Sequence, residues 1–417
     1  MLKEHTLIAN SGIQIITLPL SINTQEKFKM WYHEWYDTTN GEWRLDPVYE
    51  LRTEDECIYY NKQQLYKGGY LADPSYEIDP NDLTNDGITP LRIDDVNCQG
   101  VKGEIFNMTF ADRDCKLQSF ENVWLPLPYF FKRTPKRIKF GSLNWARLKL
   151  VPKSENKGIK YYDAILVFDT RARYESTDEY DECPVFPDKF CGDMDFTLCN
   201  NEFYLMDYCT SDKKWSYVDD YLLHLVHPEV QRVSQIKGAN VRRMAYVASY
   251  TFIINYLAQK ALLPTVKLYK DKDVEVKDVD MVVDIGNSRT TALLIEDNSN
   301  FNQVRHLELI DYTNLVKETN EGLVVNKYGE PFDMRLAFRK VDFGKFGIKD
   351  SKQFVYPSLV RLGQEANHLI HLATNDVDET ESLSTYSSPK RYLWDSRPSK
   401  EEWKFLVLNG EKDDHIL

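Results

Sequence analysis

One short motif in this chain has the residue types and the spacing that phosphate chemistry requires. A short apolar run leads to Asp284, and the flexible Gly286 follows two residues later. Three polar residues complete the turn before a second apolar run: Asn287, Ser288 and Arg289. A turn whose backbone N–H groups point the same way can hold a phosphate, and glycine permits the close approach. A carboxylate on the incoming strand can hold hydrated Mg²⁺, which takes only one or two carboxylates. The motif therefore predicts a strand, turn and strand that bind a phosphate.

A hairpin without an enzymatic role is the alternative, because asparagine and glycine are ordinary turn residues. Two downstream segments favour phosphate chemistry: FVYPSLVRLGQEA at Phe354–Ala366 and SSPKRYLWD at Ser387–Asp395. The order of the three segments resembles the amino-terminal lobe of DnaK-type chaperones, which belong to the superfamily of actin, hexokinase and chaperone ATPases. Beyond the hairpin, the matching residues are Pro357, Ser358, Gly363, Ala366, Lys390 and Arg391.

This resemblance implies ATP and Mg²⁺ as cofactors and gives the residues their roles. Asp284 holds the Mg²⁺ through water, the backbone of Gly286–Arg289 faces the phosphates, and Lys390 is a point charge near the γ-phosphoryl group. Positioning and electrostatics dominate such reactions, so this lysine need not transfer a proton. The chain departs from the chaperones at Asn287 and Ser288, where they carry two threonines. The hairpin string is also similar to the opening motif of type III pantothenate kinases.

A second resemblance covers nearly the whole chain and depends on the order of seven landmarks. They are TLIANSGIQ (Thr6–Gln14), WLPLP (Trp124–Pro128), NWARLKLV (Asn144–Val151), VFDT (Val167–Thr170), the hairpin, FVYPSLVRLG and SSPKRYLWD. Together they are similar to the amino-terminal part of the virulence factor SrfB family of bacterial proteins. Members of that family are longer, and an ATPase of the chaperone superfamily needs two lobes. The resemblances therefore imply that the chain is a fragment that carries half of a nucleotide site.

The apolar runs and the resemblance to the chaperones together predict an α+β chain in three parts. The runs predict a β-rich domain of unknown role at residues 1–222 and a helical connector at 223–277. The resemblance implies that 278–417 are the first part of an actin-like (ribonuclease H-like) ATPase lobe. Short β-type runs separated by turn residues indicate the first domain. These runs are Ile13–Leu18, Trp124–Phe131, Ile138–Val151, Tyr161–Asp169 and Glu202–Cys209. In the connector, the spacing of the apolar residues in Met244–Leu263 predicts a buried amphipathic helix that Pro264 ends, rather than a membrane span.

Composition narrows the class of protein. The hydrophobic fraction of 42% is large enough for packed cores, and the net charge of −13 disfavours nucleic acid and anionic membranes as partners. Seven cysteines, an odd number without Cys-x-x-Cys spacing, favour a reducing compartment. A zinc site among the cysteines at 183–209 and His224 or His227 is the less favoured interpretation, because structural zinc ligands come in close pairs. We therefore expect a cytoplasmic bacterial protein, with secretion left open.

Two further segments could bind a ligand, although each has a simpler explanation. A basic patch at Lys132–Lys139, next to aromatic residues, could bind RNA or lipid, but Pro135 favours an exposed hairpin loop. The run WYHEWYD at Trp31–Asp37 could stack on a sugar or a peptide. At alternating spacing it is more often part of the core of a strand or helix.

Three functions are compatible with the sequence. The first is a chaperone-like ATPase that binds and slowly hydrolyses Mg-ATP and grips a protein client through the amino-terminal domain. A small-molecule kinase of the same superfamily is the second. The third is a binding or structural protein that has lost catalysis, which Asn287 favours. Because the nucleotide site is expected to be half complete, the chain alone should bind ATP weakly or not at all.

Overall fold

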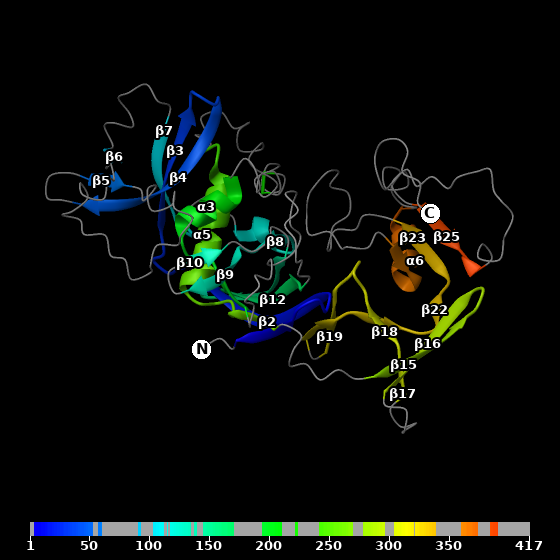
Figure 1. The fold of residues 1–417 in the computed structure, drawn as a ribbon. Helices are drawn as coiled ribbons and strands as arrows, with labels where there is room; N and C mark the ends of the chain where they lie inside the picture. The colour runs from blue at the N-terminus through cyan, green and yellow to red at the C-terminus, as the bar shows by residue number, and fades with distance from the viewer. Residues whose placement is uncertain are drawn as a thin grey trace. The chain divides into compact units, whose positions relative to one another are not determined.

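The computed structural model describes sixteen stretches of the chain. They are residues 4–52, 57–60, 91–92, 103–111, 115, 117–134, 137–139, 145–170, 194–210, 222–223, 242–269, 278–296, 304–320, 322–338, 360–373 and 384–390. The chain divides into two units, Met1–Lys272 (unit 1) and Asp273–Leu417 (unit 2), and Figure 1 shows the elements of each. Each unit has its own sheets and its own buried clusters.

The described residues of unit 1 form three sheets. The longest pairing joins β2 (Ile13–Asn23) to β12 (Ile159–Asp169) along all eleven residues of each strand. The same sheet continues through β11 (Ala146–Asn156) to β8 (Trp124–Pro126). The second sheet has the order β1 (His5–Ile8), β14 (Val266–Tyr269), β13 (Met194–Leu198), β9 (Tyr129–Thr134) and β10 (Arg137–Lys139). The third has the order β6 (Leu91–Arg92), β5 (Cys57–Tyr60), β4 (Glu42–Arg52), β3 (Met30–Asp37) and β7 (Gly103–Met108).

Most of the strands expected in unit 1 are confirmed, and one is wrong. The expected run Ile138–Val151 is divided between β10 and β11, and β9 and β10 form the hairpin expected at the basic patch. The run Glu202–Cys209 was expected to be a strand but is helix α3 (Glu202–Thr210). Four of its five residues that are described as buried fall one, three and four apart along one helical face: Tyr204, Leu205, Tyr208 and Cys209. The run is one of those expected as short β-type runs between turn residues, whereas the spacing of its buried residues is that of a helix.

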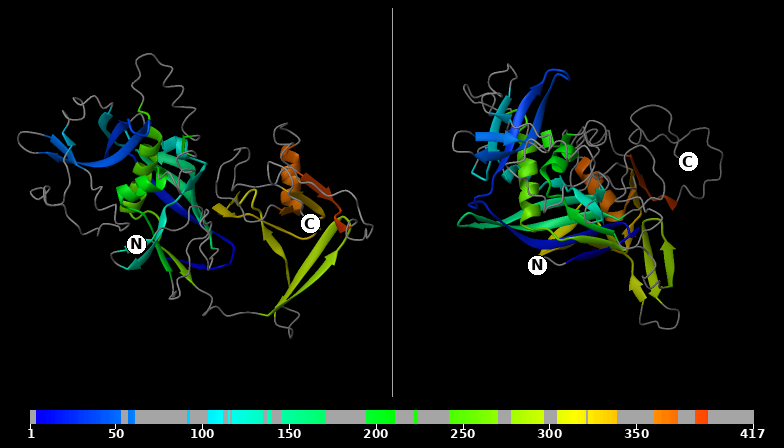
Figure 2. Two further views of the ribbon diagram at one scale, coloured as in Figure 1. Left: turned by 45° about the horizontal axis from the view of Figure 1, so that its top comes forward. Right: turned by 60° about the vertical axis from the view of Figure 1, so that its left-hand side comes forward.

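Helix α5 (Ala245–Gln259) is the centre of the core of unit 1. Every residue from 245 to 257 is buried. Its Tyr250 hydroxyl donates to the carbonyl of Pro126 in β8, and its Thr251 hydroxyl lies 2.8 Å from that of Tyr32 in β3. Figure 1 and Figure 2 show α5 between the β3–β4–β7 strands and the β2–β12 strands. The buried helix ending before Pro264 is thus confirmed, but its assignment to a helical connector is wrong, because it fills the space between two sheets.

A membrane-spanning helix is the alternative to a buried helix for the α5 segment. Among the residues that the structure describes, no helix is long and apolar enough to span a bilayer.

Glu34 on β3 stabilises the amino-terminal end of α5. The residue that precedes this helix, Met244, has no side-chain cap, and its backbone N–H instead donates to Oε1 of Glu34 at 2.5 Å. Burial raises the pKa of Glu34, while the hydrogen bond from Met244 lowers it. A carboxylate near a helix amino terminus satisfies an N–H group that lacks a partner within the helix and interacts favourably with the helix dipole.

Replacing Glu34 by alanine should therefore destabilise unit 1. We expect Glu34→Ala to lower the free energy of unfolding by about 1–3 kcal/mol, because a buried N–H loses its acceptor. Urea unfolding followed by circular dichroism measures this loss. Glu34→Gln keeps an acceptor at the same place, so its free energy of unfolding should fall less than that of Glu34→Ala. Equal losses for the two variants would contradict a capping role.

Unit 2 is made of short strands. Strand β16 (Arg289–Glu296) pairs with β15 (Val279–Ile285), β17 (Val304–His306) and β22 (Phe332–Asp333). Two further pairs are β18 (Glu308–Ile310) with β21 (Lys327–Gly329), and β19 (Val316–Thr319) with β20 (Gly322–Val325). A three-stranded sheet has the order β24 (Val360–Leu362), β23 (Arg335–Phe338) and β25 (Ser384–Ser387). Helix α6 (Gly363–Ala373) packs on this sheet through Ala366 and Leu369, which are buried against Ala337.

The predicted α+β fold with an actin-like (ribonuclease H-like) ATPase lobe is wrong. Across the described residues, strands predominate and are divided among seven small sheets. In the described part of unit 2, α6 is the single helix, and the strands do not join into one sheet that helices could cover. The order of motifs suggested a layered nucleotide lobe, but apart from β15 and β16 the described strands of unit 2 have two to four residues, which bury too little apolar surface to build such layers.

Candidate functional site

The strand, turn and strand expected around Gly286 are present. Strands β15 and β16 pair in antiparallel register, with Ile285 opposite Thr290, and the backbone N–H of Gly286 donates to the carbonyl of Arg289 at 2.9 Å. A Cβ atom on Gly286 would lie 2.4 Å from that carbonyl oxygen, a distance that real Cβ atoms do not show. Glycine is therefore required by the close approach across this turn.

The tip of the hairpin is open to solvent. Asn287 and Ser288 are both exposed, and neither donates its backbone N–H to a group in the part of the chain that the structure describes. The carbonyl of Ser288 accepts from the N–H of Met334 at 2.8 Å, which ties the turn to the segment that joins β22 to β23. The turn is thus held by its carbonyl side, and two N–H groups remain available to an anion.

A series of pairings brings Lys390 to this turn. From Met334 the chain enters β23, which pairs with β25, and the N–H of Ser388 after β25 donates to the carbonyl of Met334 at 2.8 Å. Two residues later, Lys390 Nζ donates to the carbonyl of Ile285 at 2.6 Å. An ammonium group therefore lies at the end of β15, next to the turn, although 105 residues separate the two partners in sequence. Figure 1 shows β25 beside β23 in this unit.

The carboxylates near the turn differ in their surroundings. Asp284 is exposed on β15, opposite Thr291. Arg289 Nε lies 3.8 Å from Oδ1 of Asp333, whose other oxygen accepts from Asn367 at 2.7 Å. An exposed carboxylate that keeps its hydration suits a Mg²⁺ ion bound through water. No group of three or more metal-ligating side chains occurs among the described residues.

Comparison with protein families identifies the chain. A model of the family described as virulence factor SrfB matches residues 2–415. The chain belongs to the virulence factor SrfB family. No curated protein matches the chain, and no solved structure does either. The actin-like lobe gains no support from these comparisons, and the expectation that this SrfB-family chain is part of a longer protein stays a prediction.

Two of the positions that match the chaperones, Gly363 and Ala366, lie in the first turn of α6. Gly363 has a φ of +53° and begins the helix, and a Cβ there would contact Tyr328 at 3.5 Å. Ala366 is fully buried. Other predicted positions lie outside the described residues, and these are Pro357, Ser358, Arg391, Cys183, Cys191, His224 and His227.

Sequence reasoning missed a buried polar cluster in this SrfB-family protein. Glu365 on α6 is 4% exposed and accepts from the backbone N–H of Tyr312 at 2.5 Å and from the Tyr328 hydroxyl at 3.3 Å. Burial raises the pKa of Glu365 to about 7, although the nearby Arg361 lowers it. Asp311, also buried, raises that pKa further. The signal was the helical spacing of Glu365 with Ala366, Leu369 and Ala373, which puts the carboxylate on the buried face.

Proposed function

We propose that the turn between β15 and β16 binds the phosphates of Mg-ATP. The observation that carries this proposal is the hydrogen bond from Lys390 Nζ to the carbonyl of Ile285, because it leaves two ammonium protons free to meet a phosphate beside the turn. The exposed N–H groups of Asn287 and Ser288 would donate to the same phosphate. Asp284 would hold Mg²⁺ through its water shell.

The exposure of this site limits what it can catalyse. Water surrounds Asp284 and the turn, so the charge of Lys390 is screened and stabilises a phosphoryl transition state less than it would in a dry pocket. We therefore expect weak binding and slow hydrolysis rather than rapid turnover. A chaperone-like use of this hydrolysis is part of the same proposal, with a small-molecule kinase and an inactive nucleotide-binding protein as its alternatives.

Calorimetric titration of the chain with Mg-ATP tests the proposal. Lys390→Met should weaken binding by about ten- to a hundredfold, because it removes a charge-assisted hydrogen bond to phosphate. Asp284→Asn should abolish the difference in affinity between ATP with Mg²⁺ and ATP without Mg²⁺. The matched control is Lys327→Met, since Lys327 is an exposed lysine in the same unit, on β21. Wild-type affinity in Lys390→Met, or no binding by the wild type, would overturn the proposal.

Phosphate release separates the three alternatives. Slow release that is lost in Lys390→Met supports an ATPase. Turnover that requires an added small molecule supports a kinase. Binding without any release leaves an inactive nucleotide-binding protein.

A further inference from the structure

Strand β3 presents two chemically different faces. Tyr32 and Glu34 point toward α5, as their contacts with Thr251 and Met244 show. Because successive side chains of a strand alternate, Trp31, His33 and Trp35 lie on the opposite face. Their register neighbours are Val48, Asp46 and Arg44 on β4, and Asn107, Ile105 and Gly103 on β7. We call Trp31, His33, Trp35 and these six neighbours the outer face of the sheet.

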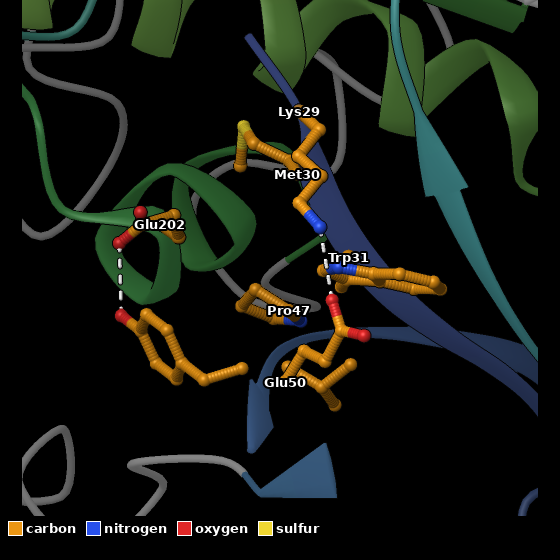
Figure 3. Close-up of a pocket in the computed structure, with 8 residues that line it drawn as sticks. Lys29, Met30, Trp31, Pro47, Glu50 and Glu202 are labelled. Atoms are coloured by element: carbon orange, nitrogen blue, oxygen red, sulfur yellow. Dashed lines mark hydrogen bonds and ion pairs between the residues drawn. The ribbon is translucent and has the colours of Figure 1, made fainter. Parts of the chain in front are cut away.

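A cavity lies at the end of the sheet where β3 begins, and its lining includes Trp31 and Val48 of the outer face as well as Met30 and Pro47 of the opposite face. Its volume is about 270 Å³, and it lies between the start of β3, the end of β4 and the start of α3. Lys29 and Glu50 form an ion pair of 2.9 Å at this cavity, and the Lys29 ammonium lies 5.3 Å from the centre of the Trp31 ring. Figure 3 shows this ion pair beside Trp31. Deeper polar groups are also present, since the Tyr49 hydroxyl donates to Glu202 at 3.0 Å.

Two ring nitrogens of the outer face are buried and have no hydrogen-bond partner among the residues that the structure describes. They are Nε1 of Trp31 and Nε2 of His33. Buried polar atoms in native proteins nearly always have a partner, so an unpaired one indicates a ligand or a water that completes it. Burial lowers the pKa of His33 to about 4, so at neutral pH its ring is uncharged and can donate or accept. At Gly103 a Cβ would lie 3.1 Å from His33 Nε2, so the glycine leaves this nitrogen room.

The rings on this face form a row that begins at the cavity. The His33 and Trp35 rings are stacked at 23° with centres 6.3 Å apart, and Trp35 Nε1 donates to Asp46 at 2.6 Å. Ring faces and edges alternate here with groups that donate and accept hydrogen bonds. A ligand that fits such a row offers hydroxyl groups, which do both, and C–H faces, which pack on aromatic rings.

We propose that the outer face of β3, from the cavity at Trp31 to Trp35, binds a neutral sugar. A hydroxyl group of the sugar accepts from Trp31 Nε1, and neighbouring hydroxyls meet the Lys29–Glu50 pair and His33 Nε2. The cavity accommodates a single sugar ring at one end of the row. This site lies in unit 1 and is independent of the phosphate-binding turn in unit 2.

The charges at this site favour a sugar over a charged polymer. Glu50 lines the cavity and Asp46 lies opposite His33 on β4, and these two carboxylates repel the phosphates of a nucleic acid. The ammonium of Lys29 already occupies the position over Trp31 that a cationic ligand would take. A neutral ligand is not repelled by the carboxylates and does not compete with the Lys29 ammonium for the face of Trp31.

Titration of the ¹⁵N-labelled full chain with glucose, galactose, mannose and N-acetylglucosamine tests this proposal. The indole N–H signal of Trp31, assigned by its loss in Trp31→Phe, should shift with at least one of these sugars. Trp31→Phe keeps an aromatic ring but removes the N–H, so it should weaken binding of that sugar about tenfold in calorimetry. Trp43→Phe is the matched control, because Trp43 belongs to the same hairpin and packs against the core on the opposite face. It should bind the sugar as the wild type does.

Three results would overturn the proposal. The first is that none of the four sugars shifts the Trp31 signal. The second is equal weakening by Trp31→Phe and Trp43→Phe, because the effect would then report the stability of the hairpin. The third is a shift of the Trp31 signal with lysine methyl ester and not with the sugars, which would make the cavity a site for ammonium groups.

Discussion

Unit 1 is expected to lose about 3–5 kcal/mol of its free energy of unfolding when Trp145 is replaced by alanine. Trp145 is fully buried, and its ring centre lies 4.3 Å from that of Phe196 and 5.3 Å from that of Phe168. Phe196 belongs to β13 and Phe168 to β12, so this indole joins two of the three sheets of the unit. Its Nε1 also donates to the carbonyl of Tyr129 at 3.1 Å. Alanine would leave a cavity between the sheets and an acceptor without its donor.

Urea unfolding followed by circular dichroism measures this loss. Trp145→Phe keeps a six-membered aromatic ring and loses the five-membered ring of the indole together with its hydrogen bond, so we expect a smaller decrease than for alanine. Tyr161→Ala is the surface control, because Tyr161 is 40% exposed, and it should change stability by no more than about 0.5 kcal/mol. A loss of less than about 1 kcal/mol for Trp145→Ala would show that the two sheets do not depend on this contact.

The parts of the fold that the sequence predicted well are those that local patterns determine. Alternating apolar residues and turn residues were enough to predict strands β2 and β12 and the hairpin at Gly286. The two strands of the hairpin are neighbours in sequence, and β2 and β12 pair along their full length. Helix α5 followed from apolar spacing and from Pro264. Assigning it to a connector failed, because periodicity reveals a buried face but not the sheets that bury it.

The larger architecture of unit 2 could not be derived from the order of motifs. Of the three segments that suggested an actin-like lobe, the hairpin lies in one sheet, and the described parts of the two downstream segments lie in or directly after strands of another, the three-stranded sheet of β24, β23 and β25. Lys390 lies beside Ile285 because of pairings through β22, β23 and β25, which the order of motifs does not reveal. Its role, like that of Asp284, stays a prediction.

Buried charged residues were the hardest to recognise. Glu34 was noted only as part of an aromatic run, and its role at α5 depends on a partner 210 residues away. Glu365 occurs within a landmark, yet nothing in its type indicates burial, since glutamate is rarely buried. In both cases a contact between distant elements decides the function of the carboxylate.

Unit 2 is expected to become less stable as pH rises from about 4.5 to above 7, because of Glu365. Burial raises the pKa of its carboxyl from 4.5 to about 7 in the folded protein. Below pH 4.5 both the folded and the unfolded chain carry the proton, so the stabilisation is fully present. Between these values the unfolded chain releases the proton first, and folding then has to take it up again. The expected loss above the folded pKa is about 3 kcal/mol, from 1.36 kcal/mol for each pKa unit.

Glu365→Gln isolates this effect from the titration of other groups. The groups that face Glu365 are Arg361 beside α6, Asp311, and the Tyr328 hydroxyl, and the glutamine variant keeps all three. Hydrogen exchange of the α6 amides, corrected for the pH dependence of the intrinsic exchange rate, reports the opening free energy of this region. In the wild type this free energy should fall as pH rises from 4.5 to 8, and in Glu365→Gln it should change little. The same pH dependence in both proteins would mean that Glu365 ionises freely in the folded state, so that the contacts with Tyr312 and Arg361 compensate fully for its burial.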